Sequence, residues 1–317
     1  MSGAAELPGA IRDAAARLAP HDVRTPLAPS AALGARARFK CEHLQRTGSF
    51  KLRGALNKVL ALSRAELAKG IVTSSTGNHG LGVAEALRVA GGRGTVVVSS
   101  TTSPYKMEKL TRAGLEVITE SDDPMTAELA ARALADRTGR VYISAYNDWD
   151  VVAGQGTIGV ELAEQWPAVE AIYITVGGGG LISGVASYIK SVNPAVRIVG
   201  CWPERATAMH ASIEAGRILE LPDEPTLSDG SAGNVEPGSI TFALCRDLID
   251  AHVLVSETEI ATAMRDVFRA DGARVEGAAG VALAAYRKAD RGDEASVVVL
   301  CGGNVSDETF AQATRGA

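Results

Sequence analysis

The sequence lacks the features that mark several broad classes of protein. Its 317 residues carry a net charge of −5 at pH 7, so there is no general excess of positive charge for nucleic acid or an anionic membrane surface. No apolar run reaches the roughly 18 residues that a membrane span needs. Residues 1–20 contain no apolar segment typical of a secretory signal. We therefore expect a globular protein whose partners include neither nucleic acid nor a membrane.

Cysteine is also scarce. The chain has four, Cys41, Cys201, Cys245 and Cys301, and none belongs to a C-x-x-C pair. A cysteine-based zinc or redox site is therefore not expected, and a reducing cytoplasm is the simplest setting. Cys41 and Cys201 lie at the ends of apolar runs, where buried packing is the ordinary role.

Short apolar runs alternate with longer helical patterns along the chain. The predicted strands are 71–75, 94–100, 115–120, 171–176, 196–202, 251–255 and 296–301, and the clearest predicted helices are 78–91, 125–139, 152–166 and 256–272. Strands rich in Val and Ile that alternate with helices predict an α/β fold, with parallel sheets flanked by helices. Ligands in such folds bind at the carboxyl ends of strands. The least regular region, 203–250, is predicted to be a long loop or lid.

Four successive glycines, Gly177 to Gly180, join a predicted strand to a predicted helix. Consecutive backbone N–H groups at a helix start form an anion cradle, most often for phosphate. A simple tight turn is the alternative. A dinucleotide site with Glu204 as the ribose ligand is a further alternative, but Ser183 stands where the G-x-G-x-x-G spacing requires glycine.

A second strand-to-helix junction, TSSTGNHG over residues 73–80, is unusually polar. Ser75, Thr76, Asn78 and His79 place hydroxyl, amide and imidazole groups beside the free N–H groups of a helix start. Such a junction would hold a carboxylate well. Helix capping by Ser75 or Asn78 alone is the simpler interpretation, and His79 alone would more often be structural.

Two further motifs carry reactive side chains. In LCGGN, residues 300–304, Cys301 follows a strand and two glycines allow a flat ligand to approach, although buried packing explains a cysteine there equally well. In GSFKLRG, residues 48–54, Lys51 stands at a helix start. Lys51 could be a surface residue or pair with a phosphate. It could also form a Schiff base, because burial lowers the pKa of a lysine and frees its lone pair.

Together the motifs resemble those of the pyridoxal-phosphate enzymes of fold type II. GSFKLRGA, STGNHG, AGQGTIGVEL, VGGGGLISG and CGGN occur in the family's order, TPLAPS and EHLQRTGSFK extend the match, and the resemblance covers nearly the whole chain. The most similar members are the serine/threonine dehydratases and the serine racemases. The resemblance implies pyridoxal 5′-phosphate as cofactor and a two-domain fold like that of tryptophan synthase β. Residues 1–69 and 148–317 would form the large cofactor-binding domain, and 70–147 a small domain that closes over the substrate.

The resemblance also implies the roles of individual residues. Lys51 would bind the cofactor aldehyde covalently and carry the Cα proton, with Thr76 as a second catalytic group. Cofactor contacts would come from Phe50, Asn78, Gly177, Gly178, Gly179, Gly180, Leu181, Gly230, Glu276 and Cys301. The substrate carboxylate would be held by Ser75, Thr76, Asn78 and His79.

The activity implied is conversion of a 3-hydroxy amino acid, such as L-threonine or L-serine, to a 2-oxo acid and ammonia by β-elimination. Thr76 stands where racemases of the family have the serine that serves as a second proton carrier, which disfavours racemisation. Trp202 and Ala208 stand where cation-activated relatives have carboxylates, so we expect no metal there, although Glu204 is nearby. We also expect no regulatory domain.

Other functions stay open at this point. Racemisation, β-replacement and dehydration of 3-hydroxyaspartate would use the same cofactor. A nicotinamide-dependent oxidoreductase and a catalytically silent binding protein are more remote alternatives. Members of the family are commonly dimers, so a homodimer is expected from the resemblance.

Overall fold

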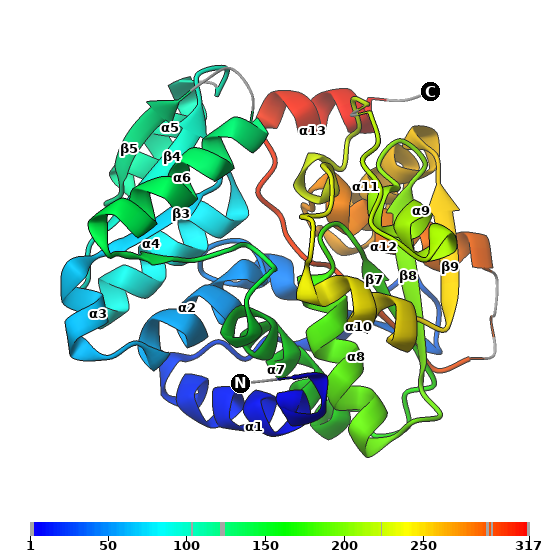
Figure 1. Cartoon of the computed structure of the whole chain (residues 1–317). Coiled ribbons are helices and arrows are strands. Elements are labelled where there is room, and N and C mark those ends of the chain that lie inside the picture. The colour runs from blue at the N-terminus through cyan, green and yellow to red at the C-terminus, as the bar shows by residue number, and fades with distance from the viewer. Residues whose placement is uncertain are drawn as a thin grey trace.

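The computed structural model describes residues 3–102, 104–120, 124–222, 224–289, 292 and 294–315. The strands form two separate sheets (Figure 1). In spatial order, the six-stranded sheet contains β1 (Leu27–Pro29), β2 (Ala37–Lys40), β10 (Ser296–Val299), β7 (Ala171–Thr175), β8 (Arg197–Pro203) and β9 (Ala251–Val255). The four-stranded sheet contains β5 (Glu116–Glu120), β4 (Gly94–Ser99), β3 (Ile71–Ser74) and β6 (Val141–Tyr142).

The pairing within both sheets is parallel except between β1 and β2, which are antiparallel. This confirms the predicted α/β fold with parallel-rich sheets. All four strands of the smaller sheet lie inside the predicted small domain, 70–147. The domain boundaries themselves, and closure of that domain over a substrate, stay predictions.

Helices cover the sheets. They are α1 (Leu7–Leu18), α2 (Lys51–Ala61), α3 (Arg64–Lys69), α4 (Asn78–Ala90), α5 (Pro104–Arg112), α6 (Pro124–Thr138), α7 (Trp149–Gln165), α8 (Gly180–Val192), α9 (Ala208–Ala215), α10 (Ile240–Leu248), α11 (Glu257–Asp271), α12 (Gly277–Ala289) and α13 (Asp307–Thr314). All the predicted strands and helices are present. The largest boundary difference is at α7, which begins at Trp149 because Asp148 caps it. Within the described residues, no helix has the length and apolarity needed to cross a membrane.

The prediction that 203–250 is one long loop is partly wrong. The segment contains α9 and α10, and the described residues between them, 216–222 and 224–239, are irregular apart from the 3-10 turn Asp229–Ser231. Both helices are short, and the Pro-rich, polar residues between them conceal their periodicity. Gly216, with φ 69°, ends α9, and the Ser239 side chain caps α10 by accepting a hydrogen bond from the Thr241 N–H.

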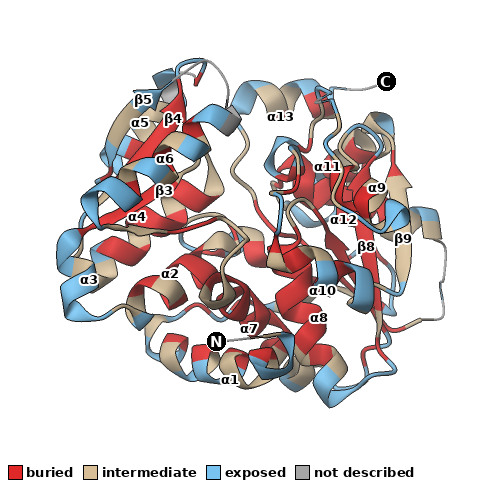
Figure 2. Cartoon of the chain, viewed as in Figure 1, coloured by how far each residue is buried: buried red, intermediate tan, exposed pale blue. Residues whose placement is uncertain are grey.

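The larger core surrounds the central strands of the six-stranded sheet. Every residue of β7 is buried, as the predicted two-sided burial of a Val/Ile-rich strand requires. Burial is concentrated on β7, β8 and the helices that pack on them, including α8 and α12 (Figure 2). A second hydrophobic cluster contains buried residues of α2, α4, β3 and β4, so it joins these two helices to the smaller sheet.

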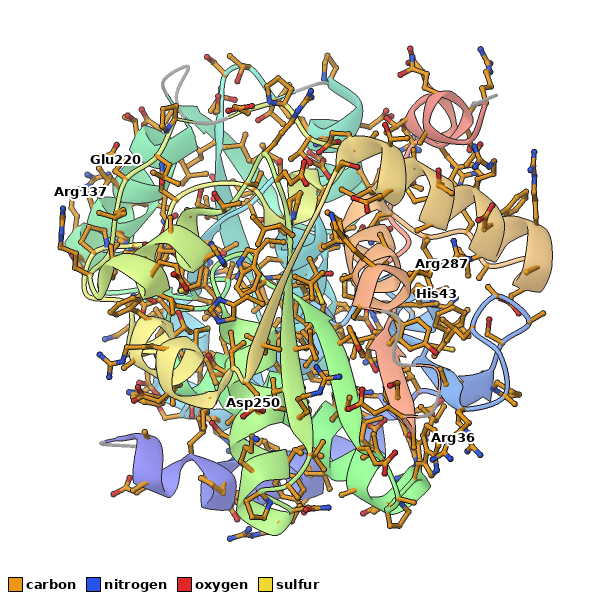
Figure 3. All side chains as sticks on the ribbon, turned by 90° about the vertical axis from the view of Figure 1, so that its right-hand side faces the viewer. Arg36, His43, Arg137, Glu220, Asp250 and Arg287 are labelled. Atoms are coloured by element: carbon orange, nitrogen blue, oxygen red, sulfur yellow. The ribbon has the colours of Figure 1, made fainter. Side chains whose placement is uncertain are left out.

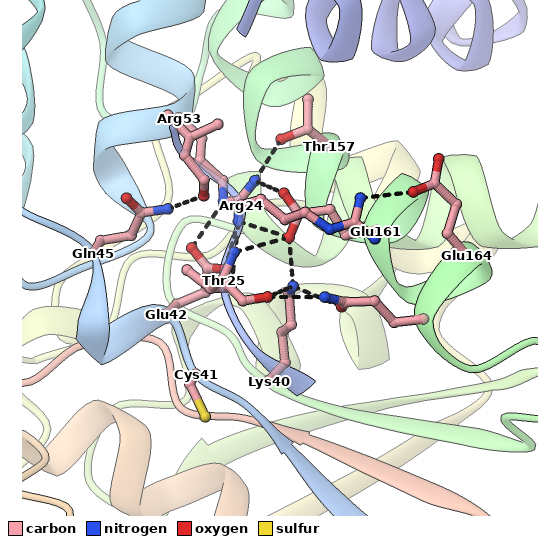
Figure 4. Close-up of polar contacts among 12 residues, drawn as sticks. Arg24, Thr25, Lys40, Cys41, Glu42, Gln45, Arg53, Thr157, Glu161 and Glu164 are labelled. Carbon is pink, nitrogen blue, oxygen red and sulfur yellow. Dashed lines mark hydrogen bonds and ion pairs between the residues drawn. The ribbon is translucent and has the colours of Figure 1, made fainter. Parts of the chain in front are cut away.

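A cluster of buried charges joins β2, α2 and α7 (Figure 4). Arg53 Nη2 lies 2.8 Å from Glu42 Oε1, and Arg53 Nη1 lies 2.5 Å from Glu161 Oε1. Lys40 Nζ lies 2.5 Å from Glu161 Oε2 and also donates to the Thr25 carbonyl oxygen. Burial opposes ionisation, but the charges of Arg53 and Lys40 hold the pKa of Glu161 below its ordinary value. Because Arg53 lies in the first turn of α2, the cluster fixes the start of that helix.

The cluster leads to a prediction about stability. Replacement Glu161→Ala would leave Lys40 and Arg53 buried with fewer partners, and removing one partner of a buried ion pair costs about 3–5 kcal/mol. Glu164 is the matched control, because it lies on the same helix and pairs with Arg24 at 2.7 Å with 56% of its side chain exposed. Glu164→Ala should cost less than about 1 kcal/mol. Urea unfolding followed by circular dichroism measures both, and equal losses would contradict the assigned role of the cluster.

Candidate active site

The loops that follow β3, β7 and β10 meet at one cavity of about 240 Å³. Every candidate residue predicted from the sequence lines it: Phe50, Lys51, Ser75, Thr76, Asn78, His79, Gly177, Gly178, Gly179, Gly180, Leu181, Gly230, Glu276 and Cys301. Segments far apart in the chain are therefore brought together at the carboxyl ends of strands in both sheets, as expected for parallel α/β folds. The roles of the individual residues stay predictions.

Lys51 is the first residue of α2. A bend precedes it, with Gly48 at φ 76°, a conformation that favours glycine. The turn after β10 holds this bend in place. The Phe50 N–H donates to the Cys301 carbonyl oxygen at 3.0 Å, and the Gly303 N–H donates to the Gly48 carbonyl oxygen at 2.9 Å. Gly48 therefore lets two distant loops join directly before the lysine.

The Lys51 amine points into the cavity wall and donates to the Ala145 carbonyl oxygen at 2.9 Å. Burial lowers the pKa of Lys51 to about 8, although the nearby Cys301 and Glu276 oppose the shift. Nζ lies 5.2 Å from the centroid of the Phe50 ring. An amine with this pKa is partly unprotonated near neutral pH, which a bond to an aldehyde requires.

The glycine loop has no room for side chains. A Cβ at Gly178 would lie 2.5 Å from Tyr146 Cδ1, and one at Gly179, where φ is 84°, would lie 2.6 Å from Cys245 Sγ. Thr241 Oγ1 donates to the Gly178 carbonyl oxygen at 2.6 Å and so fixes the loop from outside. The loop leads directly into α8, whose N-terminus favours an anion.

Asn78, Glu276 and Asn304 form a polar network across the cavity. Asn78 Nδ2 donates to Glu276 Oε1 at 2.8 Å, and Asn304 Nδ2 donates to Asn78 Oδ1 at 2.7 Å. The Asn304 N–H donates to Glu276 Oε2 at 3.2 Å. Burial raises the pKa of Glu276 to about 7, although the Asn78 hydrogen bond opposes the shift. Asn304 was not singled out from the sequence, because its role arises only where β10 ends beside α4.

His79 and Cys301 are both buried and electrically neutral near pH 7. Burial, with the charge of Lys51, lowers the pKa of His79 to about 3. His79 Nε2 lies 3.2 Å from the Ile143 carbonyl oxygen. Burial raises the pKa of the Cys301 thiol well above its ordinary value, and the nearby Glu276 adds to the shift.

Several lining residues could not be identified from the sequence. They are Lys106, Ala145, Tyr146, Thr175, Asp229 and Ser231. They lie on four separate segments, namely α5, the loop before α7, the end of β7 and the 3-10 turn Asp229–Ser231, and the sequence alone does not show that these segments meet. The cavity continues into an outer cleft of about 1060 Å³, and Lys106 Nζ lies 3.6 Å from Asp229 Oδ2 where the two spaces meet. This ion pair links α5, which packs on the smaller sheet, to the 3-10 turn Asp229–Ser231.

A protein-family model described as pyridoxal-phosphate dependent enzyme matches residues 18–302. The chain belongs to this family. The match spans the Lys51, glycine-loop and Cys301 segments, so the expected cofactor, pyridoxal 5′-phosphate, is confirmed. The nicotinamide-dependent alternative gains no support.

The chain resembles named members of the family over most of its length. It is 42% identical to L-threonine ammonia-lyase of Thermotoga maritima over 289 residues, which cover 89% of this chain and 71% of the relative. It is 37% identical to serine racemase of Arabidopsis thaliana, covering 93% of this chain and 92% of the relative. The processed form of threonine deaminase isoform 2 from Solanum lycopersicum superimposes with a TM-score of 0.91 at 34% identity, covering 98% of this chain and 93% of that one.

The cavity suits pyridoxal 5′-phosphate on its own chemistry. The Lys51 amine can bond to the aldehyde, and the side-chain-free glycine loop at the start of α8 can receive the phosphate. The remaining walls, with Phe50, Asn78 and Cys301, enclose a space for a flat ring.

The glycine loop leads to a prediction about cofactor affinity. Gly178→Ala should weaken binding of pyridoxal 5′-phosphate by at least about tenfold, because the added methyl group must displace either the loop or the Tyr146 ring. Gly9→Ala in α1 is the control, since its Cβ would meet only Arg12 Nη2 at 3.9 Å. Fluorescence titration of cofactor-free protein measures both affinities. Equal affinities would show that the loop does not hold the phosphate.

Proposed function

We propose that the protein is an ammonia-lyase that converts L-threonine, or the related L-serine, to a 2-oxo acid and ammonia by β-elimination. The observation that carries the proposal is the buried amine of Lys51, with a pKa of about 8, in one cavity with the glycine loop and the polar 75–79 junction. The relatives named threonine ammonia-lyase and threonine deaminase support the same reaction class.

Bound pyridoxal 5′-phosphate supplies an electron sink for the negative charge that develops on the substrate α-carbon. Lys51 would take the proton from that carbon and then hold it as an ammonium ion. A pKa near the working pH suits a group that must both accept and return a proton. The Ala145 carbonyl oxygen accepts a hydrogen bond from Lys51 Nζ and can keep the amine oriented between these steps.

Loss of the β-hydroxyl needs a proton, because hydroxide is a poor leaving group. Two lining groups of this chain have pKa values that suit the release of a proton near pH 7. They are Lys51 once it has become an ammonium ion, and Glu276, whose pKa is about 7. Asn78 and Asn304 hold the Glu276 carboxyl in place, so its position does not depend on the substrate.

The 75–79 junction would receive the substrate carboxylate. α4 begins at Asn78, and its first N–H groups lack partners within the helix, so they can donate to an anion. The Gly77 N–H donates to Ser75 Oγ at 3.3 Å, which keeps the junction folded back on itself. Thr76 lines both the inner cavity and the outer cleft, where an entering substrate would pass.

Racemisation of an amino acid is the second candidate function, because Thr76 places a hydroxyl in the cavity with Lys51 and this hydroxyl could serve as a second proton carrier. Two features favour elimination. The Thr76 methyl group restricts rotation of its hydroxyl. The neutral Cys301 thiol offers no full charge to stabilise a long-lived carbanion, so prompt loss of the β-hydroxyl is favoured.

We also propose a homodimer, on the basis of the family resemblance, and a cytoplasmic location, on the basis of the cysteine content. The four cysteines are all free and buried, which suits a reducing compartment. Sedimentation of the purified protein tests the homodimer, and imaging of a tagged chain in its native host tests the location.

The proposed reaction is tested with Lys51→Ala. The intact enzyme should release a 2-oxo acid from L-threonine or L-serine, and Lys51→Ala should lose at least about a thousandfold in kcat/KM, as expected when a proton-transfer group is removed. The control is Lys69→Ala, an exposed lysine outside the cavity.

Chiral analysis of the remaining amino acid, across a panel that includes 3-hydroxyaspartate, separates elimination from racemisation. Racemised substrate without 2-oxo acid, or unchanged activity in Lys51→Ala, would contradict the proposed function.

A further inference from the structure

A group of metal-ligating side chains lies between α9 and β9, on residues that the active site does not use. His210 and Glu214 are four residues apart on α9 and therefore share one face of that helix. His252 lies on β9, the edge strand of the six-stranded sheet. One ligand atom from each of the three side chains lies within 4.8 Å of the others.

We propose that His210, Glu214 and His252 form a binding site for a transition-metal ion of the Zn²⁺ class. Two imidazole nitrogens with one carboxylate oxygen form a donor set that Zn²⁺ commonly accepts, with water completing the coordination. Mg²⁺ and Ca²⁺ prefer oxygen ligands and would bind poorly there. Trp202 and Ala208, the positions at which we expected no cation, supply none of these three ligands.

The indole of Trp202 orients both imidazoles. Trp202 is completely buried, and its ring centroid lies 5.3 Å from that of His210 and 5.1 Å from that of His252. The two imidazole centroids are themselves 5.1 Å apart. Histidine rings packed against a fixed indole lose less freedom when they bind a metal, so the cluster is partly preorganised.

The His252 imidazole and the Glu214 carboxylate face each other across the cluster. His252 Nδ1 lies 3.8 Å from Glu214 Oε1, too far for a strong direct hydrogen bond. Within the part of the chain that the structure describes, neither imidazole has a hydrogen-bond partner.

A metal ion at this position would connect α9 to β9. α9 lies near the start of the segment 203–250, and Arg205, three residues before this helix, lines the outer cleft. A bound ion would tie this helix to the edge strand of the large sheet. Figure 3 turns that face of the molecule toward the viewer and labels Asp250, which directly precedes β9. We therefore expect the metal to stabilise the folded protein.

The test is titration of the cofactor-loaded enzyme with ZnCl₂, after a chelator has been applied and removed, by calorimetry and by thermal unfolding. One Zn²⁺ should bind per chain and raise the melting temperature, whereas Mg²⁺ should do neither. Glu214→Gln should weaken Zn²⁺ binding by at least about tenfold, and His210→Asn and His252→Asn should weaken it further, because each removes a direct ligand.

Glu220→Gln, an exposed glutamate outside the cluster, is the matched control and should bind Zn²⁺ as the unaltered enzyme does. The Glu214 side chain is 66% exposed, so Glu214→Gln keeps the test decisive even if a histidine variant fails to fold. Failure of Zn²⁺ to bind, or affinity that Glu214→Gln leaves unchanged, would overturn the proposal and leave the histidines as aromatic packing.

Discussion

The structure depends on how the first turn of α2 is held, because that turn positions the Lys51 amine. On one side, the Phe50 and Gly303 N–H groups join the bend before Lys51 to the turn after β10. On the other, Arg53 is bound to Glu42 and Glu161 in a fully buried ionic cluster. Buried charges tolerate few alternative arrangements, since each lost partner leaves an expensive unpaired ion. The lysine is thus attached to both β2 and α7 through its own helix.

Burial explains the electrostatics of the cavity as a whole. It lowers the pKa of Lys51 to about 8 and raises the pKa values of Glu276 and Cys301. In each case burial stabilises the neutral form relative to the charged form, because a low-dielectric surrounding disfavours charge of either sign. One physical cause therefore prepares an amine that can bond to an aldehyde, a carboxyl that shares its proton near pH 7, and a thiol that stays neutral.

The sequence predicted much of the fold because Val/Ile-rich strands and amphipathic helices have distinct periods. The glycine run and the polar 75–79 junction were recognisable because a phosphate or carboxylate site uses local backbone. The buried ionic cluster was not predictable, since Lys40, Arg53 and Glu161 come from three separate elements and look like ordinary charged residues in the sequence. α9 and α10 were missed because short helices within Pro-rich polar segments show little periodicity.

The most direct test of the account is to locate the bond to the cofactor. Cofactor-saturated protein would be reduced with borohydride, digested and analysed by mass spectrometry. The account predicts a single pyridoxyl adduct on the peptide that contains Lys51, and none on Lys106, which lines the same cavity, or on Lys109, which lines the outer cleft. An adduct on another lysine, or no adduct in saturated protein, would contradict the central role of the buried amine.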